Sequence, residues 1–130
     1  MPCPSAETFA RCVAALVDDI AGWAEEAGAA TERFTDQKQD EDGTAFEVAS
    51  LRFGNSPRGC VLSPTPPSGF GELGSVRVER LPDHETLAIL HLRSASENGD
   101  AGWDAIVFGE TEADGYRQSA VNASLIESLL

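Results

Sequence analysis

The sequence is poor in the residues that most often carry catalysis or bind metals. It has two histidines and three cysteines among 130 residues. An odd number of cysteines with no Cys-x-x-Cys pair argues against a disulfide framework and against a zinc site built on cysteine. Nucleophile-elbow, phosphate-loop and dinucleotide-binding motifs are absent as well. We therefore predict no catalytic residue, no metal and no cofactor, and we prefer a non-enzymatic role.

Long hydrophobic stretches are also missing. The longest uninterrupted apolar run is only a few residues, far short of the roughly 20 that a membrane-spanning helix needs. The first residues, Met1 to Ser5, include no basic segment followed by an apolar one, so they do not resemble a secretory signal. We expect no contact with a membrane and a cytoplasmic location.

Basic residues are scarce, and lysine occurs only at Lys38. Nine basic side chains stand against 22 acidic ones, which gives a formal net charge of −13 and a pI near 4.3. A surface of this sign repels nucleic-acid phosphates and anionic lipid head groups, so neither is an expected partner. A basic protein is the partner that this charge favours, and a salt-adapted source organism is a second explanation of the acidity.

What the sequence does contain is a long amphipathic segment near its start. Apolar residues recur there at intervals of three and four, which predicts a helix of roughly 22 to 25 residues with one apolar stripe. The stripe consists of Phe9, Val13, Leu16, Ile20, Trp23 and Ala27, and Gly28 is expected to end the helix. We prefer the interpretation that the stripe fills the core against a sheet. The alternative is that part of it pairs with a second copy of the chain.

The strongest β signal lies between Leu73 and Glu110. Three strand-like runs follow one another there: Val76 to Glu79, Thr86 to Arg93 and Trp103 to Phe108. The first run alternates apolar and charged residues, whereas the other two are apolar on both faces, as in interior strands. Pro82-Asp83 and Asn98-Gly99 supply turn residues between the runs. This pattern predicts an antiparallel meander.

Further elements are expected on both sides of the meander. Thr44 to Phe53 and Gly59 to Ser63 are strand candidates, and Tyr116 to Gln118 is a candidate for a last short strand. Phe34 to Gly43 is polar and is predicted to be a solvated loop. Ser119 is expected to cap a C-terminal helix, whose apolar face consists of Val121, Leu125, Ile126 and Leu129. Together these elements predict a single α+β domain over residues 1–130: a long N-terminal helix packed on a five- to six-stranded antiparallel sheet, followed by a short C-terminal helix.

Three residues are candidates for contacts with a partner or for the lining of a pocket. Phe70 is the one aromatic residue of a proline- and glycine-rich loop, where it either docks a partner or folds onto the core. His91 shares a strand face with Ile89, so it either lines a pocket or is an ordinary strand histidine. Trp103 begins the last run of the meander and is expected to be part of the core.

Two classes of function remain open on these grounds. The preferred one is a non-catalytic, acidic protein-binding module of the small chaperone, immunity or adaptor type, acting as a homodimer. The alternative is a small-ligand-binding domain or minor enzyme, with a pocket between helix and sheet near His91 and Trp103. A deep cavity would favour the alternative, and a flat apolar patch would favour protein binding.

Overall fold

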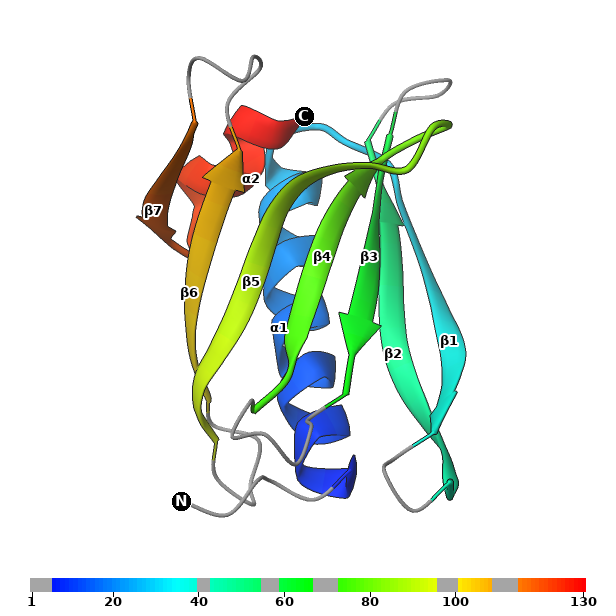
Figure 1. The fold of residues 1–130 in the computed structure, drawn as a ribbon. Helices are drawn as coiled ribbons and strands as arrows, with labels where there is room; N and C mark the ends of the chain where they lie inside the picture. The colour runs from blue at the N-terminus through cyan, green and yellow to red at the C-terminus, as the bar shows by residue number, and fades with distance from the viewer. Residues whose placement is uncertain (1–5, 40–42, 55–58, 67–72, 96–100, 109–114) are drawn as a thin grey trace.

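The computed structural model describes residues 6–39, 43–54, 59–66, 73–95, 101–108 and 115–130. Helix α1 (Ala6–Glu26) comes first, a run of strands follows, and helix α2 (Ala123–Leu129) comes last (Figure 1). The strands are β1 (Thr31–Gln39), β2 (Ala45–Phe53), β3 (Cys60–Thr65), β4 (Ser75–Arg80), β5 (Glu85–Ala95), β6 (Ala101–Phe108) and β7 (Tyr116–Ala120). The predicted α+β class and the leading helix are therefore confirmed.

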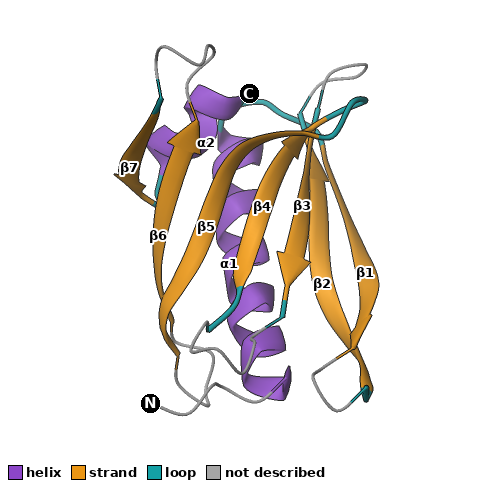
Figure 2. Ribbon diagram, viewed as in Figure 1, coloured by secondary structure: helices purple, strands orange, loops and turns teal. Residues whose placement is uncertain are grey.

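All seven strands form one antiparallel sheet in the order β1-β2-β3-β4-β5-β6-β7. The predicted meander of three strands corresponds to β4, β5 and β6, which pair with one another in sequence order. Figure 2 shows two layers, with α1 running along one face of the sheet and α2 lying beside the ends of β6 and β7. We call the face that packs on α1 the inner face and the opposite one the outer face.

Helix α1 is held by its apolar stripe. Phe9, Val13, Leu16 and Ile20 are buried in one core cluster with residues of the sheet, and Trp23 packs half-buried against it. The interpretation of the stripe as core is therefore confirmed, and these residues are not free to pair with a second copy. Ala27 lies outside the helix and is exposed. The helix ends where expected, since Gly28 has a φ of 85°, a conformation that glycine adopts without strain.

Strand alternation assigns the remaining side chains to the two faces. Val78, Ala88 and Val107 are successive neighbours across β4, β5 and β6 and belong to the core cluster. Ile89 and Ile106, one position along from core residues, pair with each other and lie outside this cluster. They mark the outer face, over which the described part of the chain places no helix (Figure 2). The outer face carries Val61, Arg77, Ile89, His91, Asp104 and Ile106.

The predicted number of strands was wrong, because the sheet has seven strands and not five to six. The missed strand is β1, most of which falls in the stretch that was predicted to be a solvated loop. Along its whole length β1 pairs with β2, yet it offers only one large apolar residue, Phe34. An edge strand of this kind is held by backbone hydrogen bonds, so the hydrophobic pattern that reveals a strand in a sequence is weak there.

Helix α2 begins later than predicted. Ser119 belongs to β7, and the N-cap is Asn122, whose Oδ1 accepts a hydrogen bond from the backbone N–H of Leu125 at 3.0 Å. Leu125, Ile126 and Leu129 are buried, as the predicted apolar face requires. Asparagine is as good an N-cap as serine, so composition alone does not choose between the two positions.

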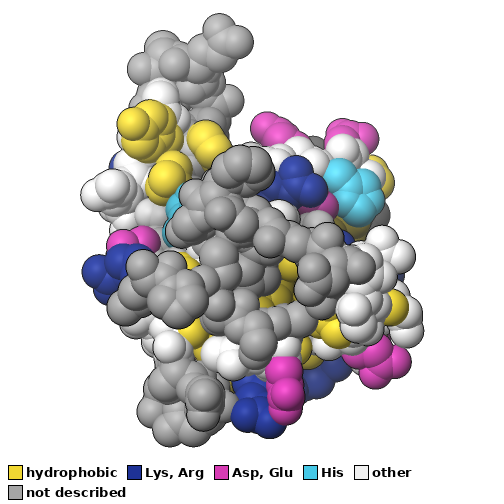
Figure 3. Space-filling view, turned by 60° about the horizontal axis from the view of Figure 1, so that its bottom comes forward, with side chains coloured by type: hydrophobic (Ala, Val, Ile, Leu, Met, Phe, Trp, Pro, Cys, Tyr) yellow, Lys and Arg dark blue, Asp and Glu magenta, His cyan; other side chains and the backbone are white. Residues whose placement is uncertain are grey.

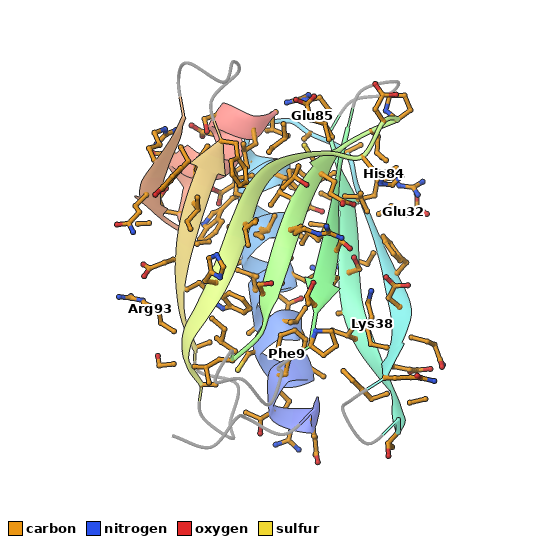
Figure 4. The ribbon with its side chains drawn as sticks, in the orientation of Figure 1. Phe9, Glu32, Lys38, His84, Glu85 and Arg93 are labelled. Atoms are coloured by element: carbon orange, nitrogen blue, oxygen red, sulfur yellow. The ribbon has the colours of Figure 1, made fainter. Side chains whose placement is uncertain are left out.

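Gly74, just before β4, lies close to Phe9 of α1. Its φ is 111°, and a Cβ built on it would lie 2.7 Å from Cδ1 of Phe9 and 3.2 Å from the carbonyl oxygen of Thr65. The carbonyl of Gly74 accepts a hydrogen bond from the N–H of Leu92 at 3.1 Å, which fixes its position. Only glycine meets both the conformational and the steric requirement. Figure 4 shows Phe9 on α1 behind the lower end of the sheet.

Candidate functional site: a pocket between helix α2 and the sheet

The candidate site is a pocket of about 420 Å³ at the end of the sheet where α2 lies. Its lining comes from five elements: the end of β4, the start of β5, the end of β6, the start of β7 and the last turn of α2. The lining residues are Arg80, Glu85, Thr86, Leu87, Val107, Phe108, Arg117, Ser128 and Leu129. Its volume falls within the roughly 300 to 1,000 Å³ of pockets that bind small molecules.

A β-bulge shapes the apolar wall of this pocket. Val78 pairs with Ala88 but Glu79 pairs with Thr86, so Leu87 is an extra residue in β5. Such a residue is turned out of the regular alternation, and here Leu87 lines the pocket and packs half-buried against the core. Together with Val107 it gives the pocket an apolar side next to its charged groups.

Arg80 joins the sheet to the end of α2. One of its terminal nitrogens donates a hydrogen bond to the carbonyl oxygen of Leu129 at 3.0 Å, and the Sγ of Cys60 lies 3.5 Å from the same oxygen. A guanidinium is well suited to this position, because the last carbonyls of a helix have no partner within it and carry partial negative charge. Burial raises the pKa of the Cys60 thiol, and the positive charge of Arg80 opposes that shift.

Arg117 projects from β7, an edge strand, and its side chain is exposed. It pairs across the sheet with Val107, so both lie on the side of the sheet that faces α2. Most cations of the described residues have a carboxylate partner: Arg11 with Glu7, Arg33 with Asp18, Lys38 with Asp36, Arg77 with Glu79, and Arg93 with Asp104. Within the described ranges only Arg52, Arg80 and Arg117 have none, and two of these three line the pocket.

Glu85 is the acidic residue of the lining. It is the cross-strand neighbour of Arg80, is exposed, and lies at the start of β5, at the upper end of the sheet in Figure 4. A second hollow of about 250 Å³ shares Arg80 and Glu85 and continues along the β4–β5 turn past Asp83. Glu79 next to this turn is only 9% exposed and is held by Arg77 at 3.7 Å and by Nδ1 of His84 at 3.2 Å.

Exposed apolar side chains gather at the same corner of the molecule. Phe108 and Tyr116 are cross-strand neighbours, 41% and 68% exposed, and Leu130 directly follows α2 with 43% exposure. Among the described residues these are the large hydrophobic side chains that stay exposed. Aromatic residues beside arginine are typical of binding surfaces, because they offer a large contact area at a small cost in conformational entropy.

The structure does not bring the predicted candidates together. His91 is exposed on the outer face, opposite Asp104 in β6. Trp103 pairs with Leu92 of the core and packs half-buried on the inner face. The side chains of His91 and Trp103 therefore point to opposite sides of the sheet. Phe70 lies outside the described residues. The pocket described above lies between α2 and the sheet, and neither His91 nor Trp103 is among its lining residues.

Sequence reasoning missed Arg80 and Arg117. A weak signal existed, since both are basic residues next to apolar runs in a chain with few basic residues. Which of the arginines lack an acidic partner depends on the folded structure, however, and local sequence contains no information about it.

Comparison of the chain with protein-family models, with curated proteins and with solved structures finds no match in any of the three. Within the described ranges, no three His, Cys, Asp or Glu side chains come together in a way that could hold a metal ion. In the same part of the chain, neither helix has the length and apolar character needed to cross a membrane.

Proposed function

We propose that this chain is a non-catalytic protein-binding module of the small chaperone, immunity or adaptor type, which acts as a homodimer and binds a basic partner through α1. The observation that carries the proposal is the charge of the exposed side of α1. This side carries Glu7, Asp18, Asp19, Glu25 and Glu26, with Arg11 as the only basic residue of the helix.

Within the part of the chain that the structure describes, only some of these carboxylates are paired with a cation, so part of the negative charge of α1 is available to a basic partner. Arg11 pairs with Glu7, and Arg33 of β1 pairs with Asp18. Glu25 accepts a hydrogen bond from the uncharged hydroxyl of Thr31 at 2.8 Å. Exposed ion pairs contribute little and are easily exchanged, so a cationic surface can replace them. An uncompensated acidic surface also speeds the encounter with a basic partner at low ionic strength.

The middle of this helix side is flat, since its exposed residues there are Ala14, Ala15 and the half-buried Gly22. A partner can therefore approach the backbone of α1 closely while its cations reach the carboxylates on either side. The opposite side of the helix is fully engaged in the core, so the helix is a rigid platform for such a contact.

Titration of the protein with a short lysine-rich peptide at low salt tests this proposal. The test variant neutralises three carboxylates of α1 (Asp19→Asn, Glu25→Gln and Glu26→Gln). The control variant neutralises three exposed carboxylates of the sheet and its turns (Glu32→Gln, Glu47→Gln and Asp83→Asn), so both variants lose the same charge. We expect roughly tenfold weaker binding for the α1 variant and a much smaller change for the control. An equal loss in both would mean that only the net charge matters, and the proposal would be wrong.

For the homodimer we infer that the two copies meet through the outer face of the sheet. Two copies of a chain with a net charge of −13 repel each other, so the contact must exclude the acidic side of α1. The outer face combines the apolar pair Ile89 and Ile106 with charges of both signs, Arg77 and Arg93 against Asp104. Figure 3, in which the lower end of the molecule comes forward, shows cationic and anionic side chains interspersed on the described surface.

Light scattering at tens of micromolar measures the oligomeric state. We expect the native chain to have twice the mass of the 13.8 kDa protomer, and Ile89→Lys to return it to the mass of a monomer without unfolding. Ala14→Lys, which places the same charge on the exposed side of α1, should leave the dimer intact. A native chain that stays monomeric would exclude the homodimer.

A further inference from the structure

We propose that the pocket between α2 and the sheet binds a small monocarboxylic acid with an apolar body. This site is independent of the acidic side of α1, because no residue of α1 lines the pocket. The carboxylate would bind between Arg80 and Arg117, and the apolar body would lie against Leu87 and Val107.

The two arginines of the pocket are unusual in so acidic a chain. In a chain with 22 acidic residues against nine basic ones, a cation without a carboxylate partner is the exception. Arg80 and Arg117 are both such exceptions within the described ranges, and both line the same pocket. A guanidinium remains charged at any physiological pH and presents a planar set of donors that matches a carboxylate.

Arg80 also has a structural role, which takes only part of its hydrogen-bonding capacity. One terminal nitrogen donates to the carbonyl of Leu129, so donors remain on the rest of the guanidinium. This bond holds the side chain in place at the edge of the pocket, which lowers the entropic cost of binding a ligand there. Arg117 has no comparable bond among the described residues and can adjust its position to the ligand.

The charge of the lining limits the charge of the ligand. Among the described residues of the lining, Arg80 and Arg117 contribute two positive charges and Glu85 contributes one negative charge, which sum to a single positive charge. The carbonyl end of α2 adds partial negative charge on the same side. A singly charged carboxylate neutralises this lining, whereas a dianion such as a phosphate monoester would leave excess negative charge.

The pocket also has an apolar side. The bulge at Leu87 and the inward position of Val107 place aliphatic side chains beside the charged groups, and Phe108 also lines the pocket. A ligand that carried only a charge would leave this surface in contact with water. An aliphatic or aromatic body would cover it, at a gain of roughly 25 cal/mol for each Å² removed from water.

Calorimetric titration with hexanoate tests the proposal, with hexanamide and acetate as comparison ligands. Hexanamide has the same body without the charge, and acetate has the charge without the body. Because the whole protein is strongly negative, non-specific attraction cannot draw an anion to it. We expect hexanoate to bind more tightly than either comparison ligand. Equal binding of hexanoate and hexanamide, equal binding of hexanoate and acetate, or no binding of hexanoate would each overturn the proposal.

Two arginine variants locate the site. Arg117→Gln should weaken hexanoate binding by roughly ten- to a hundredfold, the range expected for the loss of a hydrogen bond to a charged group. Arg52→Gln is the matched control, since Arg52 is exposed, has no carboxylate partner in the described ranges and does not line the pocket. Similar affinities for the two variants would show that hexanoate binds elsewhere. Arg117 is exposed on an edge strand, so its replacement is not expected to unfold the protein.

A third variant changes the space and keeps the charge. Ser128→Phe, on the last turn of α2, should fill part of the pocket and weaken hexanoate binding at least tenfold while leaving the lysine-rich peptide unaffected. If hexanoate binding is unchanged in this variant, the ligand does not occupy the pocket. Because the peptide and the acid are measured on the same protein, loss of one site is distinguished from loss of the other.

Discussion

Replacing Gly74 by alanine is the most direct test of how the sheet packs on α1. The new Cβ would meet the ring of Phe9, with Cδ1 at 2.7 Å and Cε1 closer still. Phe9 is fully buried in the core, and the carbonyl of Gly74 is held by the N–H of Leu92, so neither side can move away without losing packing or a hydrogen bond. The φ of 111° adds a conformational penalty for any residue with a Cβ.

The expected loss of stability has two parts. A residue held in a sparsely populated backbone region costs about 1 to 3 kcal/mol. Forcing an extra methyl group into a packed core costs about 1 to 3 kcal/mol more. We therefore expect Gly74→Ala to lower the free energy of unfolding by roughly 2 to 6 kcal/mol, which is a substantial part of the roughly 5 to 15 kcal/mol typical of a domain.

Urea unfolding followed by circular dichroism measures this loss, and Gly28→Ala separates its two parts. Gly28 also has a positive φ, 85°, but a Cβ there would have nothing within 4 Å. It should therefore show only the conformational cost, about 1 kcal/mol. In a Phe9→Leu background, Gly74→Ala should be less harmful than in the native chain, because the smaller side chain leaves room. If the two glycine variants are equally destabilised, the close packing of Gly74 on Phe9 is refuted.

Three further predictions concern other parts of the molecule. Trp103→Ala should destabilise the protein by about 3 kcal/mol, because the ring of Trp103 packs on the core. His91→Ala, on the exposed outer face, should change the free energy of unfolding by less than about 0.5 kcal/mol. Equal melting temperatures of the two variants would contradict the assignment of these side chains to opposite faces. The melting temperature should rise with sodium chloride, because the negative charges of a chain with a net charge of −13 repel one another and salt screens this repulsion. The Debye length shortens from about 30 Å at 0.01 M to about 3 Å at 1 M. A melting temperature independent of salt would show that charge repulsion does not limit the stability of the protein. Burial raises the pKa of the Cys60 thiol above its ordinary value of 9.0, so the folded state keeps a proton that the unfolded state releases. The corresponding stabilisation is present below pH 9.0 and is lost as the pH rises through the folded-state value, and Cys60→Ala should reduce this alkaline loss in urea titrations.

Much of the fold was predictable because its signals are local. The stripe from Phe9 to Ile20 repeats with the period of a helix, and burial against the sheet is the way such a stripe is covered. The strands β4 to β6 were predictable because each is an apolar or alternating run followed by turn residues. The predicted α+β class followed from the order of these elements.

The tertiary structure alone decided the elements that lack a hydrophobic pattern. β1 is polar and exists because its backbone completes the hydrogen bonds of β2, which the composition of Thr31–Gln39 does not reveal. The start of α2 depended on a choice between Ser119 and Asn122, both good N-caps. Pairing of Ser119 with Ala105 in the sheet settled that choice.

The candidate site was the least predictable part. His91 and Trp103 belong to neighbouring strands, but the register between β5 and β6 places their side chains on opposite faces of the sheet. Neither that register nor the bulge between Leu92 and Ser94 was visible in the sequence. The sequence by itself determined the net charge, the long helix and the meander, because charge is a sum over residues and periodicity is a property of neighbours along the chain. Only the folded chain decided that Arg80 and Arg117, from different strands, share one pocket without an acidic partner among the described residues, because that depends on distances between segments remote in sequence.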